Sequence, residues 1–574
     1  MNRNLPLLAT GLALTLALAF PVRAQTGDAA DAAATAAAAA VTPAQPLTPE
    51  TLYTLLLAEI AGARGRIAVA VEAYVTLARH TRDPRIAQRA TEIALFARDL
   101  AATAEAAQIW SETDPASEEA RRVLAGALVT DERRLDEVQT QFARVLASSP
   151  EQLEPNLMSL NRALAPVADK QAARNIVDRL TEPYLNRPEA HFARAQAALA
   201  AQDASGAQAA IEAALRVRPD WEPGVLLKAH LLLQSGAIRE SNTLLDEYLL
   251  RHPESHNARL AHARALVSAR QFEAARSQFR TLLEAAPDDR DLMYAVALLS
   301  TQLNDLDTAH ALFERALAAD HPEADTIRLN LGQIAERRND TDGALRWYAA
   351  VAPGRHYLDA QVRIAGALAH QGKLQQAREH LHGVSGDEDT RKQLLLAETQ
   401  LLRDAGRETE AFQLVDAALR NSPDDGELLY ESSMLAEHLG QLDVMESRLR
   451  KLIALRPDHA HAHNALGYSL ADRGLRLDEA EAMIARALEL APDDPFILDS
   501  MGWVRFRRGA AADALDHLQR AYGLRADPEI AAHLGEVLWS LQRRDDAARI
   551  WDEALQAHPD NDAVKRTVER LRAR

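Results

Sequence analysis

The sequence of 574 residues contains no cysteine. This absence excludes disulfide bonds, thiolate catalysis, Cys-ligated zinc and iron–sulfur clusters, so packing alone must stabilise the chain. Aromatic residues make up only 5% of the sequence although hydrophobic residues make up 47%, because alanine fills many apolar positions. Alanine is the best helix former and allows helices to approach closely. Since no long β-branched alternation is present either, the composition predicts helices and disfavours sheet folds.

Positive charge is also scarce. The chain has 65 Lys and Arg residues against 83 Asp and Glu residues, which gives a formal net charge of −18. A nucleic-acid-binding surface needs a basic stripe that neutralises phosphates. We therefore expect no nucleic-acid partner, and an acidic surface that attracts basic proteins instead.

The N-terminus has the pattern of a signal peptide over residues 1–24. Arg3 gives a short positive region, Leu5–Phe20 form an apolar core, and a small residue, Ala24, ends the segment. The apolar run is shorter than the roughly 20 residues that span a membrane, and no later segment is apolar enough. The pattern predicts export to a periplasm, with the product either free there or peripheral to the outer membrane. No cysteine is available to carry a lipid anchor.

Residues 25–47 are rich in alanine, threonine and proline, and this composition predicts a disordered linker. We expect ordered structure to begin at Thr48, a good N-cap, followed by Pro49 at the first helical position.

An internal period of 34 to 35 residues dominates the rest of the chain. Prolines recur at this spacing at Pro219, Pro253 and Pro287, and again at Pro423, Pro457 and Pro492. A small residue stands twelve positions before most of these sites and a large apolar residue eight positions before them. Paired carboxylates follow several of the prolines, at Asp288-Asp289, Asp424-Asp425 and Asp493-Asp494, where we expect them to cap the next helix.

This pattern resembles the tetratricopeptide repeat family from residue 51 to residue 559. Those 509 residues divide into about 15 units of 34. The resemblance implies an all-α fold, an α-solenoid of about 15 helix pairs forming a superhelix over 48–559, with a capping helix over 560–574. The motif is weak near 85–118, 150–188 and 357–392. Gly467, Gly502 and Gly535 stand where first helices are expected to cross their neighbours closely.

The sequence motifs that suggest an enzyme are incomplete. The segment Gly366–Lys373 looks like a phosphate loop, but it has the wrong spacing and Leu374 where Ser or Thr is needed. His459, His461 and His463 could approach a zinc ion, yet only two imidazoles share a helix face and no acidic ligand is paired with them. We therefore expect no catalysis, no cofactor and no metal.

Partner binding is the remaining function, and the first helix of each repeat is expected to line the groove. In the last three repeats the predicted groove residues are His461, Asn464, Tyr468, Phe496, Asp499, Trp503, Phe506, Glu529, Glu536 and Trp539. Aromatics interleaved with carboxylates suit a segment of net positive charge. For Trp503 and Trp539, packing between helices is an equal alternative, whereas Trp110 and Trp551 fall at a core position.

The N-terminal edge is a second candidate surface, because the first helix carries apolar residues on nearly every face. Leu52, Leu55 and Leu56 are its predicted partner-binding residues. Two alternatives are that the Ala-rich linker folds back over this edge or that two chains associate through it.

Three C-terminal segments, residues 463–472, 497–503 and 527–539, are more specific than the general repeat. They resemble exported proteobacterial tetratricopeptide proteins, among them adaptor lipoproteins that bring cell-wall hydrolases to a periplasmic carboxyl-terminal processing protease. The resemblance implies a non-catalytic scaffold or adaptor with such partners. A scaffold of exopolysaccharide secretion or cell-envelope assembly is the first alternative, and a regulator of peptidoglycan synthases is the second. The missing lipid-bearing cysteine departs from the lipoproteins.

Overall fold

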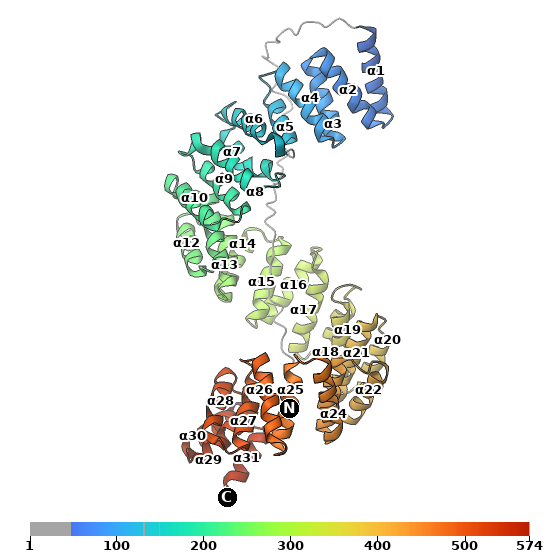
Figure 1. The fold of residues 1–574 in the computed structure, drawn as a ribbon, viewed down its shortest axis with the longest axis vertical. Helices are drawn as coiled ribbons and strands as arrows, with labels where there is room; N and C mark the ends of the chain where they lie inside the picture. Colours follow the sequence, from blue (N-terminus) through green and yellow to red (C-terminus); the bar gives the residue numbers. More distant parts are fainter. Residues whose placement is uncertain (1–47, 130–131, 149, 573–574) are drawn as a thin grey trace. The chain divides into compact units, whose positions relative to one another are not determined.

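A computed structural model of the chain describes residues 48–129, 132–148 and 150–572. The predicted signal peptide, residues 1–24, and the predicted linker, residues 25–47, lie outside the described residues. Within the described residues the chain forms 31 α-helices and no strand (Figure 1). None of these helices combines the length and the apolar character needed to cross a bilayer.

The chain divides into two compact units, with the boundary in the sequence between Ser235 and Gly236. The first unit contains α1 (Pro49–Ala63), α2 (Ile67–Thr81), α3 (Pro84–Phe96), α4 (Leu100–Thr113), α5 (Glu118–Leu128), α6 (Leu135–Ser148), α7 (Leu153–Leu164), α8 (Lys170–Thr181), α9 (Pro188–Ala200), α10 (Ala204–Val217) and α11 (Glu222–Gln234), with short 3₁₀ turns η1 (Glu132–Arg134) and η2 (Glu182–Tyr184).

The second unit contains α12 (Ile238–Arg251), α13 (His256–Ser268), α14 (Phe272–Ala285), α15 (Arg290–Gln302), α16 (Leu306–Ala318), α17 (Ala324–Arg337), α18 (Thr341–Ala349), α19 (Tyr357–His370), α20 (Leu374–Gly383), α21 (Glu388–Asp404), α22 (Glu408–Asn421), α23 (Gly426–His438), α24 (Leu442–Leu455), α25 (Ala460–Asp472), α26 (Leu477–Leu490), α27 (Pro495–Arg507), α28 (Ala511–Leu524), α29 (Pro528–Ser540), α30 (Arg544–Ala557) and α31 (Asp562–Arg572).

Helices α1–α30 follow one another as fifteen pairs, and most pairs pack a first helix against a second helix within one repeat. Each repeat also packs against the next one within its unit, as α26 does against α27. The last helix, α31, packs on α29 and α30. The predicted all-α solenoid of helix pairs is therefore confirmed.

Helix starts follow the predicted capping chemistry. The Thr48 hydroxyl accepts the backbone N–H of Thr51 at 3.2 Å, and Pro49 opens α1. In each predicted pair of carboxylates the second one is the cap, namely Asp289 before α15, Asp425 before α23 and Asp494 before α27. These caps satisfy backbone donors that the first helical turn leaves unpaired.

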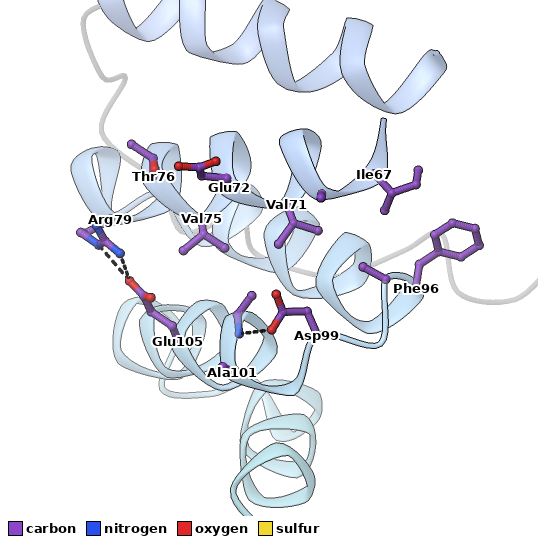
Figure 2. A pocket seen from close by; sticks show the side chains of 13 residues that line it. Ile67, Val71, Glu72, Val75, Thr76, Arg79, Phe96, Asp99, Ala101 and Glu105 are labelled. Carbon is purple, nitrogen blue, oxygen red and sulfur yellow. Dashed lines mark hydrogen bonds and ion pairs between the residues drawn. The ribbon is translucent and has the colours of Figure 1, made fainter. Parts of the chain in front are cut away.

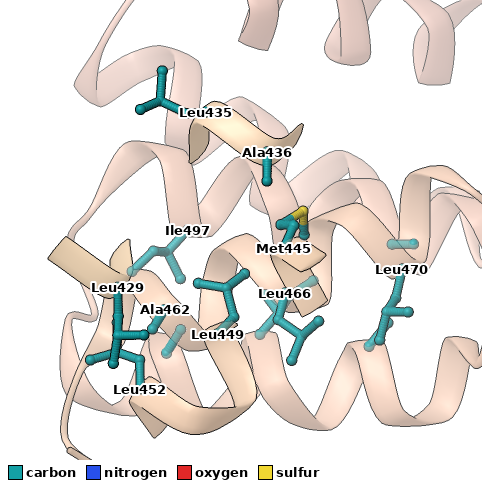
Figure 3. Packing of buried hydrophobic residues seen from close by; sticks show 14 of the residues in the cluster. Leu429, Leu435, Ala436, Met445, Leu449, Leu452, Ala462, Leu466, Leu470 and Ile497 are labelled. Carbon is teal, nitrogen blue, oxygen red and sulfur yellow. The ribbon is translucent and has the colours of Figure 1, made fainter. Parts of the chain in front are cut away.

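The core of the second unit shows how the repeats are held together. Leu449 and Met445 of α24 pack with Leu466 of α25 and Ile497 of α27, and all four side chains are almost fully buried (Figure 3). The predicted core positions of Trp110 and Trp551 are also confirmed, because both side chains are buried. Apolar burial of this kind is the main stabilising term in a solenoid.

The three repeat glycines stand at close helix contacts. A Cβ atom would lie 2.6 Å from Ile484 Cγ1 at Gly467, 2.5 Å from Leu518 Cγ at Gly502 and 2.0 Å from Trp551 Nε1 at Gly535. The contacted side chain belongs in each case to the second helix of the same repeat. The expectation that these glycines stand where first helices closely cross a neighbouring helix is therefore confirmed.

The segment that looked like a phosphate loop is part of a repeat. Gly366 lies inside α19, and Gly372 takes a left-handed φ of 75° in the turn before α20. This turn is the predicted inter-helix turn of the repeat, so the glycines serve the fold.

Candidate functional site

The candidate site is the face formed by the first helices of the last three repeats, α25, α27 and α29. Asn464 and Asp499 occupy equivalent positions on α25 and α27, 35 residues apart, and His533 stands one residue after the equivalent position on α29. Tyr468 and Trp503 follow four residues after Asn464 and Asp499, so they lie on the same helix face one turn further on. The repeat thus places a polar residue and an aromatic residue side by side along this face.

A charged pair joins α27 to α29. The Nδ1–H group of His533 donates to both carboxylate oxygens of Asp499, at 3.0 and 2.9 Å. Both side chains are largely buried. Burial opposes the charge on His533, but the neighbouring carboxylates, Asp499 first, raise its pKa above the usual value. When the imidazole is protonated, it forms a buried ion pair with the Asp499 carboxylate between the two repeats.

Aromatic rings enclose this pair. The Trp503 ring stacks on the His533 ring, with centroids 4.2 Å apart and an interplanar angle of 21°. On the other ring nitrogen, His533 Nε2 lies 3.5 Å from Tyr468 Oη of α25. His533 is thus in contact with side chains from both preceding first helices.

Trp503 is a packing residue, which decides between the two readings of its sequence position. Its side chain is only 7% exposed, and its indole N–H donates to Asp472 Oδ1 at 3.3 Å. The Arg507 guanidinium lies 5.7 Å from the ring centroid. A side chain so enclosed holds α25 and α27 together and offers a partner almost no surface.

Trp539 also serves packing. Its ring centroid lies 5.7 Å from that of Trp551, and the Arg544 guanidinium lies 5.1 Å from it. Glu536 of the same helix is taken up by an ion pair with Arg570 of α31, with one contact of 2.9 Å. Two of the predicted groove residues on α29 therefore already contact other side chains of the protein.

The remaining predicted groove residues form a more open rim. His461 and Glu529 are exposed, whereas Asn464, Tyr468, Phe496 and Phe506 are half-buried. The Asn464 amide oxygen is buried and has no hydrogen-bond partner. The Phe496 ring lies beneath the Arg525 guanidinium, 5.1 Å away, and the Phe506 ring lies 5.5 Å from that of Trp503.

Carboxylates from four successive first helices surround Tyr468. Burial raises the pKa of the Tyr468 hydroxyl, and the carboxylates Asp499, Asp472, Glu529 and Glu437 raise this pKa further. The hydroxyl is therefore neutral at physiological pH. The face as a whole combines this hydroxyl with carboxylates from neighbouring first helices.

Sequence reasoning missed His533, the residue at the centre of this arrangement. Its position lay close to the predicted groove stripe, because His533 stands one residue after the position on α29 that is equivalent to Asp499. The partners of an imidazole, however, depend on which neighbouring helices approach it, and the period alone does not give those distances.

The three-histidine segment has structural roles. His459 caps α25, because its Nδ1 accepts the Ala462 N–H at 3.1 Å, and its ring lies 5.4 Å from that of Tyr430. The Nε2–H group of His463 donates to the Pro457 carbonyl at 3.1 Å. Among the described residues, no group of three or more His, Cys, Asp or Glu side chains could hold a metal ion.

At the N-terminal edge the structure separates the three predicted residues. Leu52 and Leu56 are 39% and 50% exposed. Leu55 instead packs against the core formed with α2 and α3. Leu55 therefore belongs to the fold, and only Leu52 and Leu56 remain candidates for partner contact.

Two family models for the tetratricopeptide repeat match this chain, one over residues 301–357 and 435–495 and the other over residues 232–299. Over 522 residues the chain is 34% identical to the TPR repeat-containing protein PA4667 of Pseudomonas aeruginosa, and the match covers 90% of this chain and 88% of that protein. The chain belongs to the tetratricopeptide repeat family. Stacked repeats of this kind present extended surfaces to protein partners, so the chain is a protein-interaction scaffold.

Further similarities cover less of the chain or are weaker. Cellulose synthase operon protein C of Pseudomonas fluorescens is 25% identical over 287 residues, which are 46% of this chain and 22% of that protein. Among solved structures, a thermophilic TPR protein of Thermus thermophilus is 25% identical with a TM-score of 0.29, and the match covers 31% of this chain and 97% of that one.

Proposed function

We propose that this protein is an exported, non-catalytic adaptor of the bacterial cell envelope. Its partners are a periplasmic carboxyl-terminal processing protease and the cell-wall hydrolases that this protease cleaves. The proposal is supported by the signal-peptide pattern of residues 1–24, by the resemblance of the C-terminal repeats to such adaptors, and by the similarity to a Pseudomonas repeat protein over 90% of the chain.

The acidic face around Tyr468 is the observation that carries the binding role. The His533–Asp499 ion pair and the stacked Trp503 fix α25, α27 and α29 in register. Because a protonated His533 neutralises Asp499, the attraction for a partner comes from the outer carboxylates, such as the exposed Glu529. A preorganised acidic surface binds a basic segment without ordering its own side chains first.

The test is capture of partners from a periplasmic extract by the mature chain, identified by mass spectrometry. Glu529→Lys reverses a charge on this face, and we expect it to lower capture at least tenfold. Glu553→Lys is the matched control, because Glu553 is exposed on α30 of the same repeat, outside this face. Equal capture by both variants would show that the face is not the binding surface. Capture that never includes a protease would overturn the adaptor role.

Export is tested separately by cell fractionation. We expect the full chain in the periplasmic fraction and a chain that lacks residues 1–24 in the cytoplasmic fraction. Equal distribution of the two forms would contradict the signal-peptide assignment.

A scaffold of exopolysaccharide secretion or cell-envelope assembly is the second candidate. The similarity of 287 residues to a cellulose synthase operon protein favours it. A deletion strain separates the two candidates. Accumulation of uncleaved cell-wall hydrolases supports the adaptor, whereas loss of secreted polysaccharide with normal hydrolase levels supports the second candidate.

A further inference from the structure

Exposed apolar side chains are concentrated at the N-terminal end of the described chain. Nine of the fourteen large hydrophobic side chains that are exposed in the described residues lie between Leu52 and Leu100. A repeat has no structural use for such a concentration, and exposed apolar surface of this kind marks interaction sites. Part of this surface adjoins a groove that the sequence analysis did not find.

The groove lies between the second helices of the first two repeats, α2 and α4, and encloses about 840 Å³. Its α2 wall is built from residues at four-residue spacing, Ile67, Val71 and Val75, with Arg79 one turn beyond them. From Ile67 to Arg79 the helix rises roughly 18 Å, since each residue adds 1.5 Å. The groove therefore matches about three turns of a docked helix.

The two ends of the groove differ in character. At one end the Phe96 ring stands beside Ile67 and is 76% exposed (Figure 2). At the other end Arg79 and Glu105 form an ion pair, with Arg79 Nε 2.8 Å from Glu105 Oε1 (Figure 2). An apolar ring at the entrance and a charged pair at the far end give the groove a direction.

The charge of the lining is acidic. Glu72, Asp99 and Glu105 contribute three negative charges against the single positive charge of Arg79, which Glu105 already pairs. Glu72 is exposed on the α2 wall and has no partner among the described side chains. An incoming helix must therefore bring aliphatic side chains for the floor and basic side chains for the rim.

We propose that this groove, named here the α2–α4 groove, is a docking site for an amphipathic, basic helix of a partner protein. The proposal rests on the scaffold function proposed above, because an adaptor that joins two partners needs a second surface apart from the acidic face of α25–α29. Helix-in-groove binding of this kind uses apolar anchors at i, i+3, i+4 and i+7.

The sequence argues against occupation of the groove by the N-terminal linker or by a second copy of the chain. Residues 25–47 contain Asp28 and Asp31 and no Lys or Arg, and most of their side chains are small. A second copy of the chain, with a net charge of −18, would bring like charge to an acidic rim. A basic partner helix satisfies both the apolar floor and the rim.

The test uses a displayed library of helical peptides with a fixed aliphatic stripe and randomised flanking positions, selected on the full chain. We expect enrichment of peptides with Lys or Arg beside the stripe. A synthetic enriched peptide, measured by fluorescence anisotropy, is expected to bind Phe96→Ser and Ala101→Arg at least tenfold more weakly than the unchanged chain. Ala101 is exposed in the groove, so the arginine fills it without disturbing the core.

Leu250→Ser is the matched control, because Leu250 is 83% exposed on α12, and it should leave the affinity unchanged. The proposal is overturned if no basic peptide is enriched, or if Phe96→Ser and Ala101→Arg bind as tightly as the control. A rise in affinity after removal of residues 1–47 would show that the linker occupies the groove, and would also overturn the proposal. A dimer that Phe96→Ser dissociates would do the same, because a second copy of the chain would then be the occupant. Partner capture through Glu529 is measured independently, so either result stands without the other.

Discussion

At the scale of single residues, one glycine and one histidine make helix contacts that other residue types could not replace. Gly502 lets α27 approach α28, where a Cβ atom would stand 2.5 Å from Leu518 Cγ and 3.1 Å from the Ala514 carbonyl oxygen. His533 connects α29 to the two preceding first helices. A shift of a few tenths of an ångström would change either contact, so a substitution at either position should have a measurable effect.

Gly502→Leu should lower the free energy of unfolding by on the order of 1–3 kcal/mol, because the side chain overpacks the contact between α27 and α28. Gly523→Ala is the control on α28, since nothing lies within 4 Å of its added Cβ atom, and it should be neutral or slightly stabilising. Urea unfolding gives the magnitude. Hydrogen exchange should rise mainly in the C-terminal repeats, and an even rise along the whole chain would contradict nearest-neighbour coupling.

The His533–Asp499 pair makes the C-terminal repeats sensitive to pH. Because the folded pKa of His533 is raised above 6.5, its contribution to stability is fully present below pH 6.5 and is lost as pH rises through the raised value. Burial lowers the pKa of His517 and His459, which gives contributions of the opposite sign. The unchanged chain must therefore be compared with Asp499→Asn.

We expect Asp499→Asn to remove most of the loss of stability above pH 6.5 in α27–α29, measured by hydrogen exchange at several pH values. An NMR titration of His533 in the unchanged chain checks the same point without a mutation. A midpoint at or below 6.5 would show that Asp499 does not hold the proton on this ring.

At the scale of helices, the capping residues allow the predicted helix starts to be tested. Asp494→Ala should cost about 1 kcal/mol, because Asp494 Oδ1 accepts the N–H groups of Phe496 and Ile497 at 2.9 and 3.1 Å. Asp493→Ala removes only a surface ion pair with Arg520 and should cost less than about 1 kcal/mol. Thermal unfolding of the two variants in parallel decides the point, and equal losses would mean that the cap is misassigned.

Much of this architecture was predictable because the repeat is a local pattern. Proline spacing, the caps at Asp289, Asp425 and Asp494, and the buried Trp551 all follow from positions within the period. In one segment where the motif is weak, the packing departs from it, because α7 packs more against α9 than against α8. In the other two, α3 packs on α4 and α19 on α20 as ordinary repeat pairs.

The sites were less predictable, because they depend on contacts between helices. The period put Tyr468, Asp499 and Trp503 on one face but could not show that Trp503 is enclosed. It also gave no sign of the α2–α4 groove, whose residues Val71 and Val75 are buried like the rest of the core. Such a groove exists only because two second helices leave space between them.

At the scale of the whole molecule, the two ends of the solenoid are finished differently. At the C-terminal end, α31 buries Val564 and pairs Arg570 with Glu536, so a polar helix covers the last repeat. At the N-terminal end, α1 leaves Tyr53 and Ile60 exposed, together with Leu52 and Leu56. A solenoid end normally turns a polar face outward, so this edge differs from a simple cap.

The double change Leu52→Gln and Leu56→Gln tests whether that edge contacts a partner. The two side chains are exposed, so we expect the circular dichroism spectrum and the melting temperature to stay nearly unchanged while partner capture falls at least tenfold. Each buried leucine contributes roughly 1.5–3 kcal/mol to a complex, which is enough to account for that loss. Leu55→Gln is the contrasting variant, because Leu55 packs against the core and its change should lower the melting temperature of the first repeats. Should the double change lower the melting temperature as Leu55→Gln does, while capture by the folded chain persists, the edge belongs to the fold and the partner binds elsewhere.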